Sequence, residues 1–419
     1  MGRVWFAVIV ASCACAAPAL GDEPQQQPSS GISRWFDPAT APFIPVPAID
    51  IDPNSGTTLG IIPVYLVTDE GGDIKRIYAP DIVYNQYFGW GADGRILGYP
   101  SENTQWSVVG GFMQRVESNF DAQYTTGRLR EDPWSFFVEA TYDRSGTARF
   151  YGLGNESRVF DQAVYTNQQE YFIAQLGWNI NRHWQLAYRT NPSKVEITPG
   201  NLGTIPPIGH RFPGLLGLGV THSFLNRLQL TYDTRDDLTV PTRGVAVTAY
   251  GGVASRNGGI NNSLYSEAGV DARGYWSPNP SLTFAAHTAF SYLPTTHRTP
   301  FWALSSIGGD ESILGGDQPL RGFGVGRYYD RNSFSLSLEM RKRVASFDAV
   351  STHIDLQVTP FIDTGSVFAH ANAPETFEAL HKVFGLGIRG VARPFVVGYI
   401  DAGIGSEGVA IFTGLNYPF

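Results

Sequence analysis

The sequence predicts an all-β fold, a transmembrane antiparallel β-barrel of about 16 strands with a long glycine-rich loop in its lumen. Three features predict this class: an alternating C-terminal segment that ends in an aromatic residue, an N-terminal export signal, and the lack of a long apolar run elsewhere. A spanning helix needs about 20 apolar residues, and only helices and closed barrels satisfy every backbone hydrogen bond in lipid. A mature chain of this kind that crosses a membrane therefore crosses it as a barrel.

The C-terminal segment, GVAIFTGLNYPF, alternates strictly from Gly408 to Phe419. Ile411, Thr413 and Tyr417 fall on one face, which suits hydrocarbon, and the opposite face is mostly small or polar. We expect this segment to be the last strand, with Tyr417 and the terminal Phe419 forming a C-terminal barrel signal. A strand of a secreted soluble sandwich could alternate in the same way and is the competing interpretation.

The N-terminus, residues 1–21, has the features of a secretory signal peptide. Arg3 precedes an apolar stretch, and small residues follow it, which is the usual order in such signals. Cleavage would remove both cysteines of the chain and leave a mature protein without thiols, as suits an oxidising compartment. The alternative is a lipoprotein signal, because residues 10–13 fit a lipobox that would leave Cys13 acylated.

The remainder divides into two regions. Residues 22–49 are rich in Pro, Gln and Ser, and we expect a tether or a plug-like segment there. Residues 50–419 alternate and form the predicted barrel domain. About 370 residues at some 20 to 25 per strand and turn give roughly 14 to 18 strands, and closure with an even number favours 16. The clearest runs are 58–68, 106–115, 134–143, 171–180, 184–190, 227–233, 245–251, 334–343 and 354–368.

Composition and spacing argue against several classes of function. The formal net charge of -8 is unsuited to nucleic acid as a partner. The eight histidines are scattered, and the calcium-like segment 50–56 has its glycine one place late with no bidentate glutamate behind it. We also find no G-x-S-x-G elbow. The sequence therefore predicts no metal, no cofactor and no enzymatic activity.

Two motifs stand out from the alternating pattern as a turn and a loop. The turn contains Asp233, Arg235 and Asp236, followed by Pro241 and Gly244, so Pro and Gly fix the bend while the charges can pair along the rim. The loop is glycine-rich from residue 308 to 326 and carries Arg321, Gly322 and Phe323 near its middle.

A third motif is a pair of acids on two strands that otherwise alternate cleanly. Glu339 falls on the inward face with Ser333, Ser335 and Ser337, and Asp363 falls on the inward face of the next strand. An acid on a lumen-facing position is available to a cation that enters the barrel.

These motifs resemble the BamA/TamA-type family of outer-membrane assembly and translocation barrels, also called the bacterial surface antigen family. Residues 233–244 are similar to its D-x-R-[DN]…P-x-x-G turn, Leu320–Phe323 to its R-G-[FY] loop motif, and Phe361–Gly365 to its F-x-D-x-G strand. The likeness runs from about residue 42 to 419, and the motifs together are specific where each alone is weak.

The resemblance implies that the loop folds back into the lumen and that Arg321 meets Glu339 and Asp363. A planar guanidinium can bridge two carboxylates and so fix a flexible loop to the barrel wall. Gly322 and Phe323 would shape the loop around this contact. The alternative is that Arg321 is a solvated loop residue and that Glu339 and Asp363 only line a water-filled lumen.

The resemblance also implies a location in the outer membrane of a Gram-negative bacterium and a role in inserting or translocating proteins or other substrates there. Expected partners are outer-membrane lipids, unfolded outer-membrane protein clients, and the barrel assembly machinery through the C-terminal strand. The chain departs from the family in leaving no room for POTRA repeats, so we expect a POTRA-less subgroup. The alternatives are a passive pore for solutes or lipids and a structural surface antigen.

Overall fold

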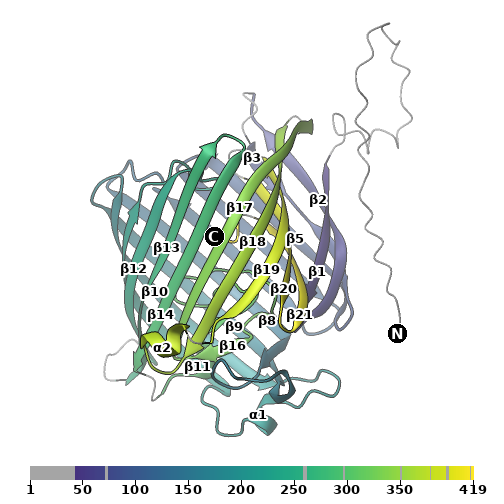
Figure 1. Ribbon diagram of the computed structural model, residues 1–419, viewed down its shortest axis with the longest axis vertical. Coiled ribbons are helices and arrows are strands. Elements are labelled where there is room, and N and C mark those ends of the chain that lie inside the picture. Colours follow the sequence, from purple (N-terminus) through teal and green to yellow (C-terminus); the bar gives the residue numbers. More distant parts are fainter. Residues whose placement is uncertain are drawn as a thin grey trace, which may run out of the picture.

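Antiparallel strands that follow one another along the chain wind into a closed barrel in the computed structural model (Figure 1). The structure describes residues 43–70, 74–257, 262–295, 298–349, 352–377, 379–392, 396–415 and 417–419. The expected signal peptide and most of the expected Pro/Gln/Ser-rich segment lie outside these residues. Across the described ranges, no helix combines the length and the apolar character needed to span a membrane.

The wall consists of nineteen hydrogen-bonded strands, and two further strands form a small sheet of their own. The strands are β1 (Ile44–Asp52), β2 (Gly56–Thr68), β3 (Ile74–Tyr78), β4 (Asp81–Asn85), β5 (Gly89–Ser101), β6 (Thr104–Met113), β7 (Ser118–Thr126), β8 (Trp134–Phe150), β9 (Ala163–Asn179), β10 (Trp184–Pro199), β11 (Gly219–Asp233), β12 (Gly244–Ser255), β13 (Ser263–Asn279), β14 (Leu282–Thr295), β15 (Ser305–Ile307), β16 (Tyr328–Asp330), β17 (Asn332–Ala349), β18 (Thr352–Phe368), β19 (His381–Ala392), β20 (Val396–Gly405) and β21 (Gly408–Leu415). The helices are the short α1 (Ile208–Arg211) and α2 (Ala373–Phe377), with single 3₁₀ turns η2 (Val159–Asp161) and η4 (Phe301–Ala303).

The wall has eighteen strand positions in its described residues, because β3 and β4 both pair with β2 and β5 and so share one position. The break between them falls at Pro80, which has no N–H to donate to a ladder. The antiparallel barrel is confirmed, but the expectation of about 16 strands was wrong. The first strand also begins at Ile44, six residues before the expected boundary at residue 50.

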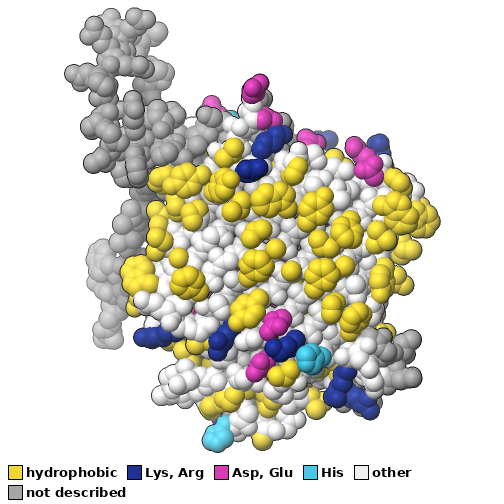
Figure 2. All heavy atoms as spheres, turned by 180° about the vertical axis from the view of Figure 1, so that it is seen from behind, with side chains coloured by type: hydrophobic (Ala, Val, Ile, Leu, Met, Phe, Trp, Pro, Cys, Tyr) yellow, Lys and Arg dark blue, Asp and Glu magenta, His cyan; other side chains and the backbone are white. Residues whose placement is uncertain are grey.

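The outer surface of the barrel is apolar and follows the period-two pattern of the strands. On β9, Phe172, Leu176 and Trp178 are exposed, whereas Ile173 and Asn179 are buried. Figure 2 shows hydrophobic side chains spread over the middle of the wall and charged ones gathered toward its two ends. This distribution is that of a barrel whose outer band faces hydrocarbon.

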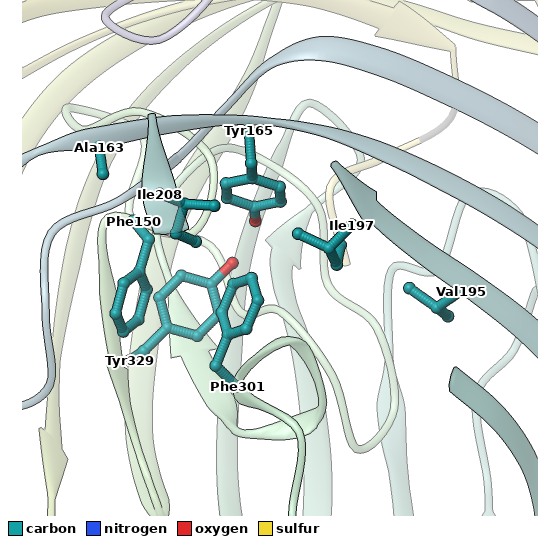
Figure 3. Packing of buried hydrophobic residues seen from close by; sticks show 8 residues of the cluster. All are labelled: Phe150, Ala163, Tyr165, Val195, Ile197, Ile208, Phe301 and Tyr329. Carbon is teal, nitrogen blue, oxygen red and sulfur yellow. The ribbon is translucent and has the colours of Figure 1, made fainter. Parts of the chain in front are cut away.

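The two ends of the barrel differ in the length of their connections. Connections 151–162, 200–218 and 298–331 lie at one end, which we call the long-loop end, and connections such as 102–103, 180–183 and 280–281 lie at the other, the short-turn end. An apolar cluster lies at the long-loop end (Figure 3). In it, Phe150 and Tyr165 of the wall pack against Phe301 of the long loop. Their ring centroids lie 5.1 and 5.2 Å from that of Phe301.

The barrel closes where β1 meets β21, at a contact that we call the seam (Figure 1). In the described residues its backbone pairing is a single pair, Ile51 opposite Ile411, whereas β1 pairs with β2 over its full length. The Thr413 hydroxyl donates to the carbonyl oxygen of Ile49 and accepts a hydrogen bond from the Ile49 N–H. A threonine side chain therefore replaces part of a backbone ladder.

Prolines explain the weak pairing on the β1 side of the seam. Alternate residues of an antiparallel strand direct their N–H groups to the same neighbour. The Ile49 N–H faces β21, so positions 45 and 47 face β21 as well, and both are proline. Neither can donate a ladder hydrogen bond.

The C-terminus differs from the expectation. Strand β21 ends at Leu415, and Tyr417 and Phe419 lie inside the barrel instead of continuing the wall with Tyr417 toward lipid. The guanidinium of Arg341 lies 3.7 Å from the Tyr417 ring centroid, and Phe419, which is 5% exposed, stacks on His287. These aromatic contacts to a buried cation stabilise the inward course, and Pro418 does not favour continuing the ladder.

We expect Thr413→Val to loosen the seam, because the change leaves the Ile49 N–H and carbonyl without their partner. One net hydrogen bond is worth about 1 kcal/mol, which corresponds to roughly fivefold faster amide exchange at Ile49. Hydrogen–deuterium exchange with mass spectrometry measures this rate on the folded barrel.

Thr288→Val is the matched control, since the Thr288 hydroxyl also donates to a neighbouring strand, at the Ser335 carbonyl, but within a continuous ladder. Exchange at Ile49 should not change in this variant. An Ile49 amide that exchanges equally fast in wild type and Thr413→Val would contradict the role assigned to the hydroxyl.

Candidate functional site

The glycine-rich loop enters the lumen from the long-loop end and packs against the wall from inside. Its two limbs pair as β15 and β16, and its middle carries the apolar residues Leu320 and Phe323. Both are fully buried and pack in a cluster with Phe361 of β18 and Val383 of β19. Burial of this apolar surface holds the loop against the wall.

Arg321 lies at the centre of this packed loop and is fully buried. Its Nε and Nη2 donate to the two oxygens of Asp363, each at 2.8 Å, and its Nη1 donates to Glu339 at 2.6 Å. The same Nη1 donates to Asp401 at 2.9 Å. The guanidinium also lies 3.7 Å from the centroid of the Phe361 ring. The structure thus brings Arg321 together with both acids that the sequence indicated, and with a third.

Two further arginines complete the site. Arg389 donates to Asp401 through both Nη atoms and to Glu339 at 3.2 Å. Arg341 donates to the second oxygen of Glu339 at 2.8 Å. The site, which we call the Arg321 site, therefore contains three guanidinium groups and three carboxylates, each residue at most 3% exposed: Arg321, Arg341, Arg389, Glu339, Asp363 and Asp401.

The equal number of opposite charges accounts for the burial of such a site. An unpaired charge in a low-dielectric interior costs several kcal/mol, and here every charged group has at least one partner within hydrogen-bond distance. Burial alone would lower the pKa of Arg321, but the facing carboxylates outweigh burial and hold this pKa well above its usual value. The loop is thus attached by permanent charges.

Gly322 and Phe323 fit the loop to the wall beside Arg321. A Cβ atom on Gly322 would lie 2.6 Å from the backbone nitrogen of Gly405, so no side chain fits there. Phe323 fills the space next to this close approach and meets Tyr328 edge to face at 5.6 Å between centroids. Both residues therefore lie in the packed part of the loop beside Arg321.

Two further attachments of the loop lie on opposite sides of the seam. Arg327 pairs with Glu407, in the turn between β20 and β21, at 2.7 Å, and its Nη2 donates to the Ser157 carbonyl. Asn54, in the turn between β1 and β2, donates to the Val325 carbonyl at 2.7 Å. One loop therefore contacts the hairpin that begins the barrel and the hairpin that ends it.

The turn motif lies at the short-turn end, apart from Arg321. Asp233 accepts hydrogen bonds from the Arg235 side chain at 3.0 and 2.8 Å. Asp236 accepts the backbone N–H groups of residues 242 and 243, Pro241 is buried, and Gly244 has a φ of +100° that favours glycine. Val240 of this turn packs against Tyr417 and Val391, so the turn folds inward across the end of the lumen.

Sequence reasoning missed Asp401, Arg389 and Arg341. Arg341 follows Glu339 by two residues on the same inward face, and that spacing could have indicated it. Strands β19 and β20 alternate with many glycines, for example Gly385, Gly387 and Gly403, so their inward charges did not stand out as a motif.

We expect Asp401→Asn to destabilise the folded barrel by about 3 kcal/mol, because it leaves buried guanidinium charge without its partner. The free energy of unfolding, measured in urea with detergent micelles, tests this. Asp348→Asn is the control: that side chain is 83% exposed and pairs with an exposed histidine, so the same substitution there should change nothing measurable. Equal stability of the two variants would contradict the assignment of Asp401 to the site.

Comparison with solved structures finds similar barrels. BamA from Haemophilus ducreyi lacking POTRA domains 1-3 matches with 14% identity and a TM-score of 0.50, over 85% of this chain and 75% of that chain. CdiB from Escherichia coli matches with 13% identity and a TM-score of 0.42, over 90% and 62%. CdiB from Acinetobacter baumannii matches with 10% identity and a TM-score of 0.37, over 89% and 59%. This chain spans less than two thirds of either CdiB chain.

At these identities the structural likeness concerns the fold alone, and no curated protein matches the sequence. The family model of the Omp85 superfamily domain, in contrast, matches residues 102–390, which is more than half of the chain. The matched range includes the turn motif, Arg321, Glu339 and Asp363. An Omp85-type barrel implies an outer-membrane location, and the resemblance to the BamA/TamA type is confirmed at this level. The chain belongs to the Omp85 superfamily.

Proposed function

We propose that this barrel acts in the insertion or translocation of proteins at the outer membrane of a Gram-negative bacterium, and that its lumen loop is the frame that holds the seam. The observation that carries the proposal is the buried Arg321 site. It fixes the loop to β17, β18 and β20 through Glu339, Asp363 and Asp401. The same loop reaches both hairpins beside the seam.

Weak pairing at the seam, together with a loop fixed firmly to the rest of the wall, suits this activity. Insertion or lateral release of a client requires two neighbouring strands to separate while the rest of the barrel keeps its shape. The seam has a single backbone pair in the described residues, so its separation breaks few hydrogen bonds. The hairpins on both sides of the seam keep their positions because the loop binds each of them. Val325 of the loop contacts Asn54 of the first hairpin, and Arg327 of the loop pairs with Glu407 of the last.

The filled lumen argues against the passive pore. The loop occupies the lumen at the level of Arg321, and the 234–243 turn packs on Tyr417 at the short-turn end. Solute passage would need both obstacles to move. A structural surface antigen, the third interpretation, would need no buried charge network in its lumen, and such networks are costly to desolvate.

The test is the folding rate of an unfolded client barrel into liposomes that contain this protein. We expect wild type to accelerate folding over empty liposomes and Arg321→Ala to lose the acceleration, because the loop no longer frames the seam. Arg331→Ala is the control. Arg331 is an exposed residue directly before β17 and at the end of the same loop. It forms no ion pair with the described residues, so Arg331→Ala should behave as wild type.

The outcomes separate the three functions. No acceleration by wild type would remove the insertion activity for that client. Single-channel conductance that rises in Arg321→Ala would then support the pore, and a barrel that shows neither behaviour would support the structural antigen. Circular dichroism of each variant in the liposomes establishes that the barrel has folded.

A further inference from the structure

A chamber at the short-turn end of the lumen is lined by arginines that the Arg321 site does not use. The cavity has a volume of about 300 Å³, and three arginines, Arg128, Arg235 and Arg273, lie in its wall. Neither aspartate nor glutamate is among the described residues that line it. Its other polar lining residues, such as Gln105 and Gln123, carry amide donors.

Among the described residues, Arg128 belongs to no ion pair. It lies in the connection between β7 and β8, and no carboxylate among the described residues comes within ion-pair distance of its side chain. Burial lowers the pKa of Arg128, and the opposing charge effects of Tyr99 and Asp237 do not offset this. A half-buried guanidinium without a counter-ion is electrostatically unsatisfied.

The other two arginines are only partly engaged. Arg235 uses Nε and Nη2 on Asp233, and Arg273 uses Nε on Asp271. Nη1 of Arg235 and both Nη atoms of Arg273 are left without a carboxylate acceptor in the part of the chain that the structure describes. Each carboxylate precedes its arginine by two residues in the same strand or turn. It therefore holds the guanidinium in place while some N–H donors of that group remain available.

The Tyr275 hydroxyl supplies a second, independent observation. Tyr275 is 6% exposed and lines the chamber. Its hydroxyl lies beside the Arg235 guanidinium and otherwise has no hydrogen-bond partner in the described residues. Buried hydroxyl groups are almost always hydrogen-bonded, so an acceptor in the chamber would satisfy it.

We propose that this chamber binds a phosphate group. Guanidinium groups from three separate segments of the chain line the chamber. Their N–H donors suit the oxygens of a tetrahedral anion, and the Tyr275 hydroxyl adds a further donor. The volume suits one phosphate group with a small substituent and excludes a whole diacyl lipid. The source is either inorganic phosphate or a phospholipid headgroup.

A larger cavity adjoins the chamber at the short-turn end. Its volume is about 790 Å³, and it shares Arg128 and Arg235 with the chamber. Its outer lining mixes arginines with carboxylates, among them Asp132 and Asp236. The positive charge is thus concentrated inside, where solvent screening is weaker than at the rim.

The experiment titrates inorganic phosphate into the full chain in neutral detergent micelles at constant ionic strength, with isothermal calorimetry as the readout. We expect saturable binding that Arg128→Gln weakens by about tenfold or more and Tyr275→Phe by about fivefold. Arg128 makes no ion pair with the residues that the structure describes, and Tyr275→Phe keeps the packed ring, so both variants should fold. The control is Arg182→Gln, because Arg182 lines the outer cavity but not the chamber.

A second arm distinguishes the sources of the phosphate group. Nanodiscs of phosphatidylcholine, with and without phosphatidylglycerol, are compared by native mass spectrometry of the bound lipid. Arg128-dependent binding of inorganic phosphate assigns the site to the free ion, and Arg128-dependent retention of phosphatidylglycerol alone assigns it to a headgroup. Absence of both overturns the proposal, as does an equal loss of binding in Arg182→Gln, which would mark attraction to the rim charges in general.

Discussion

The pairing of the Arg321 guanidinium with three buried carboxylates is the interaction on which the rest of the structure depends. Glu339, Asp363 and Asp401 come from β17, β18 and β20, so the charges balance only when those strands have their correct register and the loop is in the lumen. A slip of one residue would turn each acid toward lipid, where a charge is costly. Loop position and wall register therefore specify each other. A lysine could not replace Arg321, because a compact ammonium lacks the planar fork that spans several acceptors.

The sequence predicted a residue's position where the alternation within its own strand determines that position. Alternation located the strands, and Glu339 and Asp363 stood out because they interrupt a run of small or apolar residues. Asp401 and Arg389 depend on which strands become neighbours, and their glycine-rich strands gave a weak pattern. The count of strands was too low because it divided the chain from residue 50 onward by an average length of strand and turn. Strand β1, with its two prolines, begins before that residue, and several connections are only two or three residues long, such as 53–55, 102–103 and 280–281.

The direction of the C-terminal residues also required the folded structure. Alternation alone places Tyr417 toward hydrocarbon, and this expectation was wrong because Arg341 offers its guanidinium inside the barrel. Arg341 has this position only because Glu339, two residues before it, belongs to the Arg321 site. The course of the last residues thus depends on charge pairing in the lumen as well as on Pro418, and alternation in the C-terminal segment does not encode it.

The contacts of the lumen loop make the two ends of the seam unequal in strength. Strand β1 runs from the short-turn end at Ile44 to the long-loop end at Asp52, and the loop holds Asn54 and Glu407 just beyond the long-loop end of the seam. Toward the short-turn end, in contrast, residues 45 and 47 are prolines that lack a donor, and β21 has ended at Leu415. Separation of the first and last strands therefore breaks the fewest contacts when it starts at the short-turn end and stops at the loop. Under the proposed function, a client strand would pair with the exposed edge of β1 after the seam separates. It would reach the Ile49 N–H, which donates to the Thr413 hydroxyl in the closed barrel, before it reached the two hairpins that the loop contacts.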